Sequence, residues 1–393
     1  MNRPFMYGKP VAKPYFVDRE NEFGVLLAEI GNLKDGTCMN LAVLGPRRVG
    51  KTSLIKNVIL ELESEEKVIP VFIDCLSMPS IRRFSSVFVE NAKKGYVEKT
   101  NDGAYLTKLN EYLKKSASEI LLKFSQLDIS IASYISIKLS MEDPKAEEAI
   151  LFENALNYPE ELAKSKDVYF VVFLDEFAEL AEKERDEFLK LLRTVIQQQT
   201  RVMYIFSSSA MTYMNDMVYH NKSPFYRQLK PVFIGPIPED CARNFIKERF
   251  SLASYSIGEK ALDAMLQKSN CLPDYLQRLG DALLDTAKNN PINETDVFLA
   301  YEEIFVTLDP TFSLVFARLG ENSKIYSDIV ISTARFAKPS LIARDAGIPP
   351  GSLYYYMPYL INLGLIKKIE PGQYCLTDPI FKDWIIRKFQ LEN

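Results

Sequence analysis

The stretch LAVLGPRRVGKTSL, residues 41–54, constrains the fold of this chain more than any other part of the sequence. An apolar run ends at Gly45, and Gly50, Lys51 and Thr52 open a pattern of apolar residues at helical spacing. This is the motif G-x-x-x-x-G-K-[ST] between a predicted strand and a predicted helix, which is typical of a phosphate-binding loop. We therefore predict a parallel α/β domain that binds a nucleoside triphosphate.

Each residue type of the loop has a chemical reason. Gly45 and Gly50 permit a backbone path that directs successive N–H groups at phosphate oxygens. Lys51 is expected to place its charge on the β- and γ-phosphates, and the Thr52 hydroxyl to ligate Mg²⁺. The residues expected to contact the nucleotide here are Gly45, Pro46, Arg47, Arg48, Val49, Gly50, Lys51, Thr52 and Ser53.

A second motif begins at Val168, where seven apolar residues run into Asp175 and Glu176. Such a run predicts a strand that is buried on both faces, as in a parallel sheet. Ligands of open α/β sheets bind at the carboxyl ends of the strands. We expect Asp175 to hold Mg²⁺ and Glu176 to orient and deprotonate the attacking water. The alternative for Glu176 is an N-cap of the following helix.

Two further elements could contact the γ-phosphate. The apolar run 201–206 predicts a buried strand that leads into a serine-rich turn, where Ser207 and Ser209 are the candidate sensors. Arg227 precedes the last strand of the domain and could reach the γ-phosphate of its own or a neighbouring nucleotide. A surface arginine is the alternative interpretation.

Composition excludes several classes of protein. The 393 residues suffice for two or three domains, and a net charge of −4 gives no global signature of nucleic-acid binding. Five cysteines lack CxxC spacing and His220 is the sole histidine, so zinc sites and His-based triads are not indicated. Because no apolar run approaches 18 residues and the first residues lack a signal-peptide core, we expect a cytoplasmic protein.

The rest of the chain predicts three regions. Residues 1–236 form the α/β domain, with an extended arm over 1–14, a helix that Asp18 could N-cap, and an insertion over 80–165 containing helices and a candidate hairpin. Residues 237–321 carry only helical patterns and form a lid. The helices expected there cover 239–250, 259–269, 273–288 and 295–307.

Residues 322–393 predict a winged-helix domain. Helices over 325–336, 340–346 and 352–363 precede two short strands separated by a Pro-Gly turn. Nine Lys/Arg and six Asp/Glu give this region a net charge of +3. The third helix, which would be the recognition helix, has no Lys or Arg, so both double-stranded DNA and a protein remain candidate partners. The candidate phosphate contacts are Lys338, Arg344, Lys367 and Lys368.

Taken together, these elements resemble the archaeal-type ATPase family, which is related to the STAND and AAA+ proteins and to origin-recognition initiators. The resemblance lies in FVDRENE (16–22), GPRRVGKTSL, LDEF (174–177), the serine turn, the lid and the terminal winged helix. It implies ATP as the nucleotide, since no NKxD follows the last strands. It also implies a nucleotide contact from Pro273, in a lid motif where Cys271 replaces the family's glycine. The residues that it places near the adenine are Phe16, Val17, Asp18 and Arg19.

The function expected from the sequence is an ATP-binding and slowly hydrolysing switch that uses Mg²⁺ and is stimulated by a partner. Its nucleotide state would reposition the winged helix, which would act on DNA. The alternative is a nucleotide-gated scaffold whose winged helix binds a protein. A ligand shifts such an equilibrium only by its different affinity for the two states.

Overall fold

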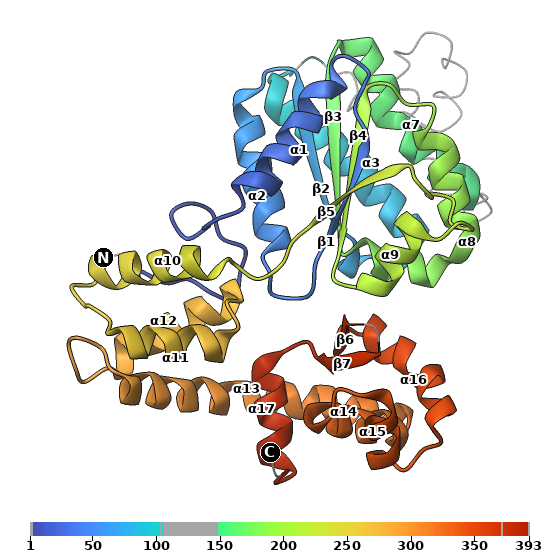
Figure 1. Cartoon of the computed structure of the whole chain (residues 1–393). Helices are drawn as coiled ribbons and strands as arrows, with labels where there is room; N and C mark the ends of the chain where they lie inside the picture. Colours follow the sequence, from blue (N-terminus) through green and yellow to red (C-terminus); the bar gives the residue numbers. More distant parts are fainter. Residues whose placement is uncertain (1–2, 103, 105–147, 371, 392–393) are drawn as a thin grey trace.

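The computed structural model describes residues 3–102, 104, 148–370 and 372–391, without the side chains of residues 182–187. The helix and hairpin expected within residues 105–141 therefore lie outside the described residues. The two ends of the insertion are described as helices, α3 (Ile81–Thr100) and α7 (Glu148–Lys166), which pack against each other beside the sheet (Figure 1).

A five-stranded parallel sheet forms the centre of the first domain. Its strand order is β2-β3-β4-β1-β5. In the register of the sheet, Asp74 lies opposite Asp175 and Leu44 opposite Ser208. Strands β1 and β3, which lie on either side of β4, therefore end at the same edge of the sheet. The strands are β1 (Asn40–Leu44), β2 (Val68–Asp74), β3 (Tyr169–Asp175), β4 (Val202–Ser208) and β5 (Leu229–Phe233).

Helices cover both faces of this sheet because successive strand residues point to opposite sides. Along β1, Leu41 and Val43 join one apolar core, whereas Ala42 and Leu44 join the other. The remaining helices of the domain are α1 (Glu20–Leu33), α2 (Lys51–Glu61), α8 (Phe177–Ile196), α9 (Met211–Tyr219) and two short 3₁₀ turns, η1 (Leu62–Ser64) and η2 (Cys75–Ser77). The prediction that Asp18 caps α1 is wrong, since the N-cap position is Arg19, in the left-handed region and without a side-chain cap bond.

Four helices follow the sheet domain: α10 (Glu239–Leu252), α11 (Glu259–Ser269), α12 (Pro273–Thr286) and α13 (Glu294–Asn322). The last is much longer than the expected helix over 295–307 and runs through Pro310. A proline inside a helix costs about 3 kcal/mol. Tertiary contacts offset this cost, since Phe312 is buried against Trp384 and the Trp384 Nε1–H donates to Asp309 Oδ1 at 2.7 Å.

The C-terminal region has the element order predicted for a winged helix. It contains α14 (Lys324–Arg335), α15 (Pro339–Asp345), α16 (Pro350–Asn362), the antiparallel strands β6 (Ile366–Glu370) and β7 (Gln373–Leu376), and α17 (Pro379–Lys388). Its apolar residues belong to a buried cluster that also contains those of the four preceding helices and of one face of the sheet. Helix α16 contacts α9 of the sheet domain, and Figure 1 shows the β6–β7 hairpin directly below that domain.

Candidate nucleotide-binding site

The loop between β1 and α2 has the conformation that phosphate binding requires. A Cβ atom on Gly45 would lie 2.4 Å from the backbone oxygen of Ile234, so no side chain fits at this position. Gly50 has φ +95°, a conformation that residues with a side chain rarely adopt. Helix α2 begins at Lys51, so its N-terminal backbone N–H groups and positive dipole end face the loop.

Lys51 is held inside the loop by backbone oxygens. Its Nζ donates hydrogen bonds to Gly45 O at 2.9 Å and to Pro46 O at 3.0 Å. Burial lowers the pKa of the Lys51 ammonium, and the nearby carboxylates of Glu176 and Asp175 act in the opposite direction. The ammonium is thus positioned at the centre of the loop, where a phosphate oxygen can replace the two carbonyls as its partner.

Asp175, at the end of β3, lies beside the start of α2. The Thr52 hydroxyl donates to Asp175 Oδ2 at 2.6 Å, and the Ser207 hydroxyl donates to the other carboxylate oxygen. Burial raises the pKa of the Asp175 carboxyl above its ordinary value, while the hydrogen bonds from Ser207 and Thr52 lower it. A hydroxyl and a carboxylate in contact are oxygen ligands of the kind that Mg²⁺ takes beside nucleotide phosphates.

Glu176 is fixed by the serine turn after β4. It has φ 48° and occupies the N-cap position of α8 without making a side-chain cap bond. Its Oε2 instead accepts hydrogen bonds from the backbone N–H and the hydroxyl of Ser209, both at 2.9 Å, and from the Ser208 hydroxyl at 3.2 Å. The turn expected to sense the γ-phosphate therefore also orients the candidate general base.

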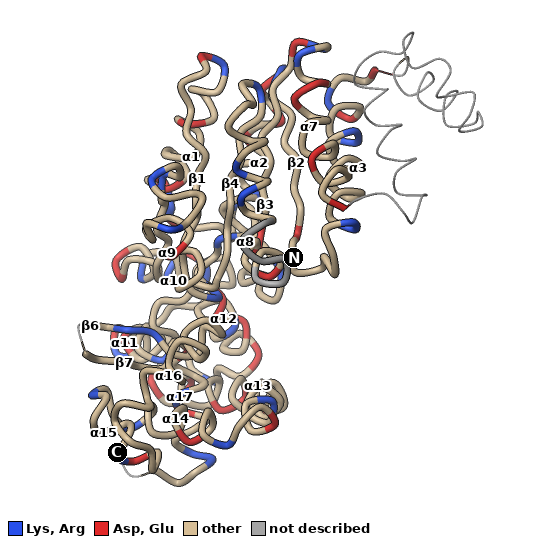
Figure 2. Tube along the Cα trace, turned by 90° about the vertical axis from the view of Figure 1, so that its right-hand side faces the viewer, with Lys and Arg blue, Asp and Glu red and all other residues tan. Residues whose placement is uncertain are grey.

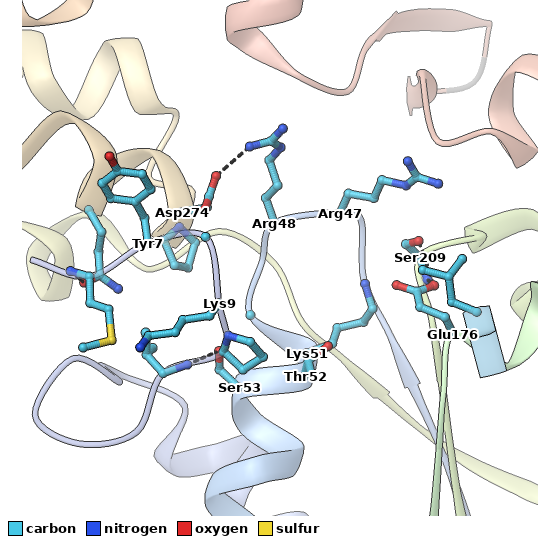
Figure 3. Close-up of a pocket in the computed structure, with 18 of the residues that line it drawn as sticks. Tyr7, Lys9, Arg47, Arg48, Lys51, Thr52, Ser53, Glu176, Ser209 and Asp274 are labelled. Carbon is cyan, nitrogen blue, oxygen red and sulfur yellow. Dashed lines mark hydrogen bonds and ion pairs between the residues drawn. The ribbon is translucent and has the colours of Figure 1, made fainter. Parts of the chain in front are cut away.

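These groups border a cavity of about 540 Å³ between the sheet domain and α12. In Figure 3, Glu176 and Ser209 lie at one end, Tyr7 and Lys9 at the other, and Lys51 and Thr52 between them. The predicted residues that line the cavity are Arg47, Arg48, Gly50, Lys51, Thr52, Ser53, Glu176, Ser209 and Pro273. Gly45, Pro46, Val49 and Asp175 do not line it directly.

The other predicted residues lie farther away. Phe16, Val17 and Arg19 border a crevice of about 30 Å³ that shares Val11 and Pro273 with the main cavity. Phe16, Asp18 and Arg19 also line a separate hollow of about 310 Å³ over α2. Their position near adenine stays a prediction.

Arg19 and Arg227 have different surroundings. The Arg19 guanidinium is buried and donates to Gly235 O at 2.6 Å and to Val49 O at 3.3 Å, so it joins the loop to the segment after β5. Arg227 is exposed and does not line the cavity, so its contact with the γ-phosphate of its own or a neighbouring nucleotide stays a prediction.

Sequence reasoning missed the N-terminal arm and several lid residues. Residues 6–11 line the main cavity together with Asp274 and Gln277 of α12. The arm carries no motif and no periodic apolar pattern that could have indicated this. Among the described residues, no cluster of three or more His, Cys, Asp or Glu side chains could hold a metal, and no helix has the length and apolarity to cross a membrane.

The comparison with protein families decides the assignment. A family model described as an ATPase domain predominantly from Archaea matches residues 16–279, more than half of the chain. The chain belongs to this family. The archaeal-type ATPase assignment agrees with the loop, the Asp-Glu pair and the cavity between them. It also establishes ATP hydrolysis as the activity of the protein.

Solved structures support the fold of this archaeal-type ATPase. A Walker-type ATPase of Pyrococcus abyssi matches with a TM-score of 0.63 at 18% identity, covering 97% of this chain and 99% of that one. The ORC2 protein of Aeropyrum pernix, in ADPNP and ADP complexes, matches with a TM-score of 0.54 at 14% identity, covering 99% and 100%. No curated protein sequence matches the chain.

Proposed function

We propose that this ATPase is a molecular switch whose nucleotide state repositions the C-terminal winged-helix domain, which acts on DNA. ATP binds between the sheet domain and the lid. The observation that carries the proposal is the position of Arg48, a residue of the phosphate-binding loop. Its Nη1 pairs with Asp274 Oδ2 of α12 at 2.6 Å, and its Nε lies 3.7 Å from Asp378 Oδ2, at the N-cap of α17.

The chemistry of hydrolysis follows from the residues around the cavity. Thr52 and Asp175 would hold Mg²⁺, which supplies charge neutralisation at the β- and γ-phosphates. Lys51 would leave the carbonyls of Gly45 and Pro46 for a phosphate oxygen. Glu176, held by the serine turn, would orient a water and accept its proton.

The switch follows from competition for Arg48. Its guanidinium also lies 4.7 Å from the centre of the Tyr275 ring, and the Tyr275 hydroxyl donates to Asp378. Nucleotide phosphates bind an arginine with the same geometry as these carboxylates do. A triphosphate that binds Arg48 would compete with Asp378 for its guanidinium. It would therefore bind more tightly when α17 has moved away from Arg48 than when α17 is in contact with it, which is the requirement for a population shift.

The switch can be tested with hydrogen exchange on Glu176→Gln protein, which is expected to retain ATP. Exchange in α16 and α17 is measured without nucleotide, with ADP and Mg²⁺, and with ATP and Mg²⁺. We expect ATP to change exchange at both helices relative to ADP. If binding of both nucleotides is verified and exchange is nevertheless equal in all three states, the switch is contradicted and the ATPase assignment remains intact.

Asp378→Asn offers a sharper version because asparagine preserves the N-cap of α17 but removes the charge that faces Arg48. Without nucleotide, we expect hydrogen exchange of α17 in this variant to be shifted part of the way toward the value that wild-type α17 shows with ATP. Asp328→Asn, on α14 of the same domain, makes the same charge change away from Arg48 and serves as the control.

Action on DNA is supported by exposed cations. Lys338 directly precedes α15 and Arg344 belongs to it. Lys367 and Lys368 lie on β6, where Figure 2 shows a basic segment. All four side chains are exposed. Phosphate contacts by these residues would make duplex binding weaken steeply with salt.

A protein partner is the second candidate. It is favoured by α16, which exposes Tyr354 and Tyr355 and has no Lys or Arg. Gel shifts of duplex DNA over increasing salt distinguish the two functions. We expect Lys367→Glu to weaken binding and Lys382→Glu, an exposed residue of α17, to have a smaller effect. Absent or salt-independent binding would favour the protein partner.

A further inference from the structure

The N-terminal arm is anchored on lid helix α12 through Phe5. The Phe5 side chain is 2% exposed, and its ring centre lies 5.0 Å from that of Phe250. The next residue is also fixed, because the Met6 backbone N–H donates to Gln277 Oε1 at 2.9 Å. The start of the arm is therefore part of the lid.

The Phe5 ring packs directly against the backbone of Gly280 in α12. A Cβ atom on Gly280 would lie 2.4–2.5 Å from three atoms of the Phe5 ring. Because the ring also packs against Phe245 and Phe250, a side chain at position 280 would have to displace it. Glycine in the middle of a helix is less favourable than alanine, so Gly280 is retained against the helix propensity of α12.

The arm is anchored a second time on α2 of the sheet domain. The Val11 backbone N–H donates to Ser53 Oγ at 3.1 Å, and the Val11 carbonyl accepts from Asn57 Nδ2 at 2.8 Å. Residues 5–11, which we call the strap, therefore connect the lid to the helix that follows the phosphate-binding loop.

Between its two anchors the strap borders the nucleotide cavity. Residues 6–11 line it, and the Tyr7 ring lies 4.5 Å from the Arg278 guanidinium of α12. The strap lies at the end of the cavity opposite Glu176 and Ser209 (Figure 3). If the triphosphate oxygens bind Lys51 and the N-terminus of α2, the nucleoside would occupy the end of the cavity that the strap borders.

We propose that the strap encloses the nucleoside end of bound ATP and slows its departure, with Phe5 and Gly280 as the anchor that keeps it closed. The inference rests on the proposed placement of ATP in this cavity, but on neither the switch nor the DNA partner. In this proposal, movement of the strap or the lid is the step that limits the departure of the nucleotide. Releasing Phe5 loosens both together because Phe5 joins them.

The test is Gly280→Ala, whose methyl group is expected to displace the Phe5 ring without changing any side chain of the cavity. Stopped-flow release of a fluorescent ADP analogue is expected to be about tenfold faster, equivalent to about 1.4 kcal/mol. Phe5→Ala should have the same effect. The double variant should be no faster than the single ones, since both remove one contact. Gly31→Ala, in α1 with open space at its Cβ position, is the matched control.

Tripolyphosphate separates the strap from the phosphate site. It lacks a nucleoside, so its affinity, measured by competition, should be the same in Gly280→Ala and wild-type protein. Unchanged release of the ADP analogue from folded Gly280→Ala protein would overturn the proposal, as would an equal loss of tripolyphosphate affinity. If nucleotide binds Lys51→Ala as tightly as wild type, the placement of ATP itself is wrong.

Discussion

Thr52 donates a hydrogen bond to Asp175 across 2.6 Å, joining the first turn of α2 to the end of β3 although 123 residues separate them in the sequence. This contact brings together the two oxygens that we expect to hold Mg²⁺.

Asp175→Asn is expected to lower ATP hydrolysis at saturating Mg²⁺ by about 10²-fold or more, equivalent to about 3 kcal/mol of transition-state stabilisation. Removing Mg²⁺ with a chelator should abolish hydrolysis in the wild type. The measurement is phosphate release over a Mg²⁺ titration. Wild-type turnover in Asp175→Asn would show that another group holds the metal.

Lys51→Ala is expected to abolish nucleotide binding because it removes the positive charge at the centre of the loop. Lys56→Ala, five residues along the same helix and exposed, should bind normally. Titration calorimetry with ATP and Mg²⁺ measures both. Nearly equal affinities in the two variants would place the triphosphate elsewhere.

Glu176→Gln is expected to retain ATP affinity while hydrolysis falls by about 10²-fold or more, the order expected on losing a general base. The amide can still accept a hydrogen bond from Ser209, so the turn should keep its conformation. Single-turnover phosphate release separates chemistry from binding. Unchanged release would dismiss Glu176 as the residue that activates water.

Asp296 should make the stability of the lid depend on pH. Burial raises the pKa of its carboxyl, but hydrogen bonds from the backbone N–H groups of Asn293 and Lys288 outweigh this and hold it below its ordinary value. Because the folded-state pKa is the lower one, the stabilisation is present above the unfolded value of about 3.9 and is lost as pH falls through the folded value.

Asp296→Asn is therefore expected to be less stable than wild type by about 1–2 kcal/mol at neutral pH, the loss of a charged acceptor of buried N–H groups. The difference should shrink as pH falls below about 4. Thermal unfolding between pH 3 and 7 measures it. A difference that stays constant over this range would show that the charge of Asp296 does not contribute.

The sequence predicted the parts of the site that depend on local patterns. The family comparison confirms the archaeal-type ATPase, and the loop at Gly45–Thr52 and the Asp175-Glu176 pair lie where the strand patterns indicated. In contrast, the pairing of Arg48 with Asp274 joins residues 226 positions apart. No local pattern encodes such a contact, and the same holds for the strap.

Two helical predictions failed for a related reason. The helix expected to end at Thr307 continues to Asn322 because Phe312 and Asp309 find partners on α17. Asp18 has the chemistry of an N-cap, but Asp18 and Arg19 both adopt the left-handed backbone conformation. In this conformation Arg19 donates a hydrogen bond to the backbone oxygen of Val49 in the phosphate-binding loop. Tertiary contacts override local propensity at both places.

The unbroken course of α13 has a mechanical consequence. At 1.5 Å per residue, its 29 residues span about 43 Å from the lid to the C-terminal domain. Apolar residues along the helix, from Val297 to Leu319, belong to one buried cluster that also contains one face of the sheet. A tilt of about 10° at the lid end of the helix would carry its far end by about 7 Å, so a small rotation beside the nucleotide would become a displacement as wide as a side chain.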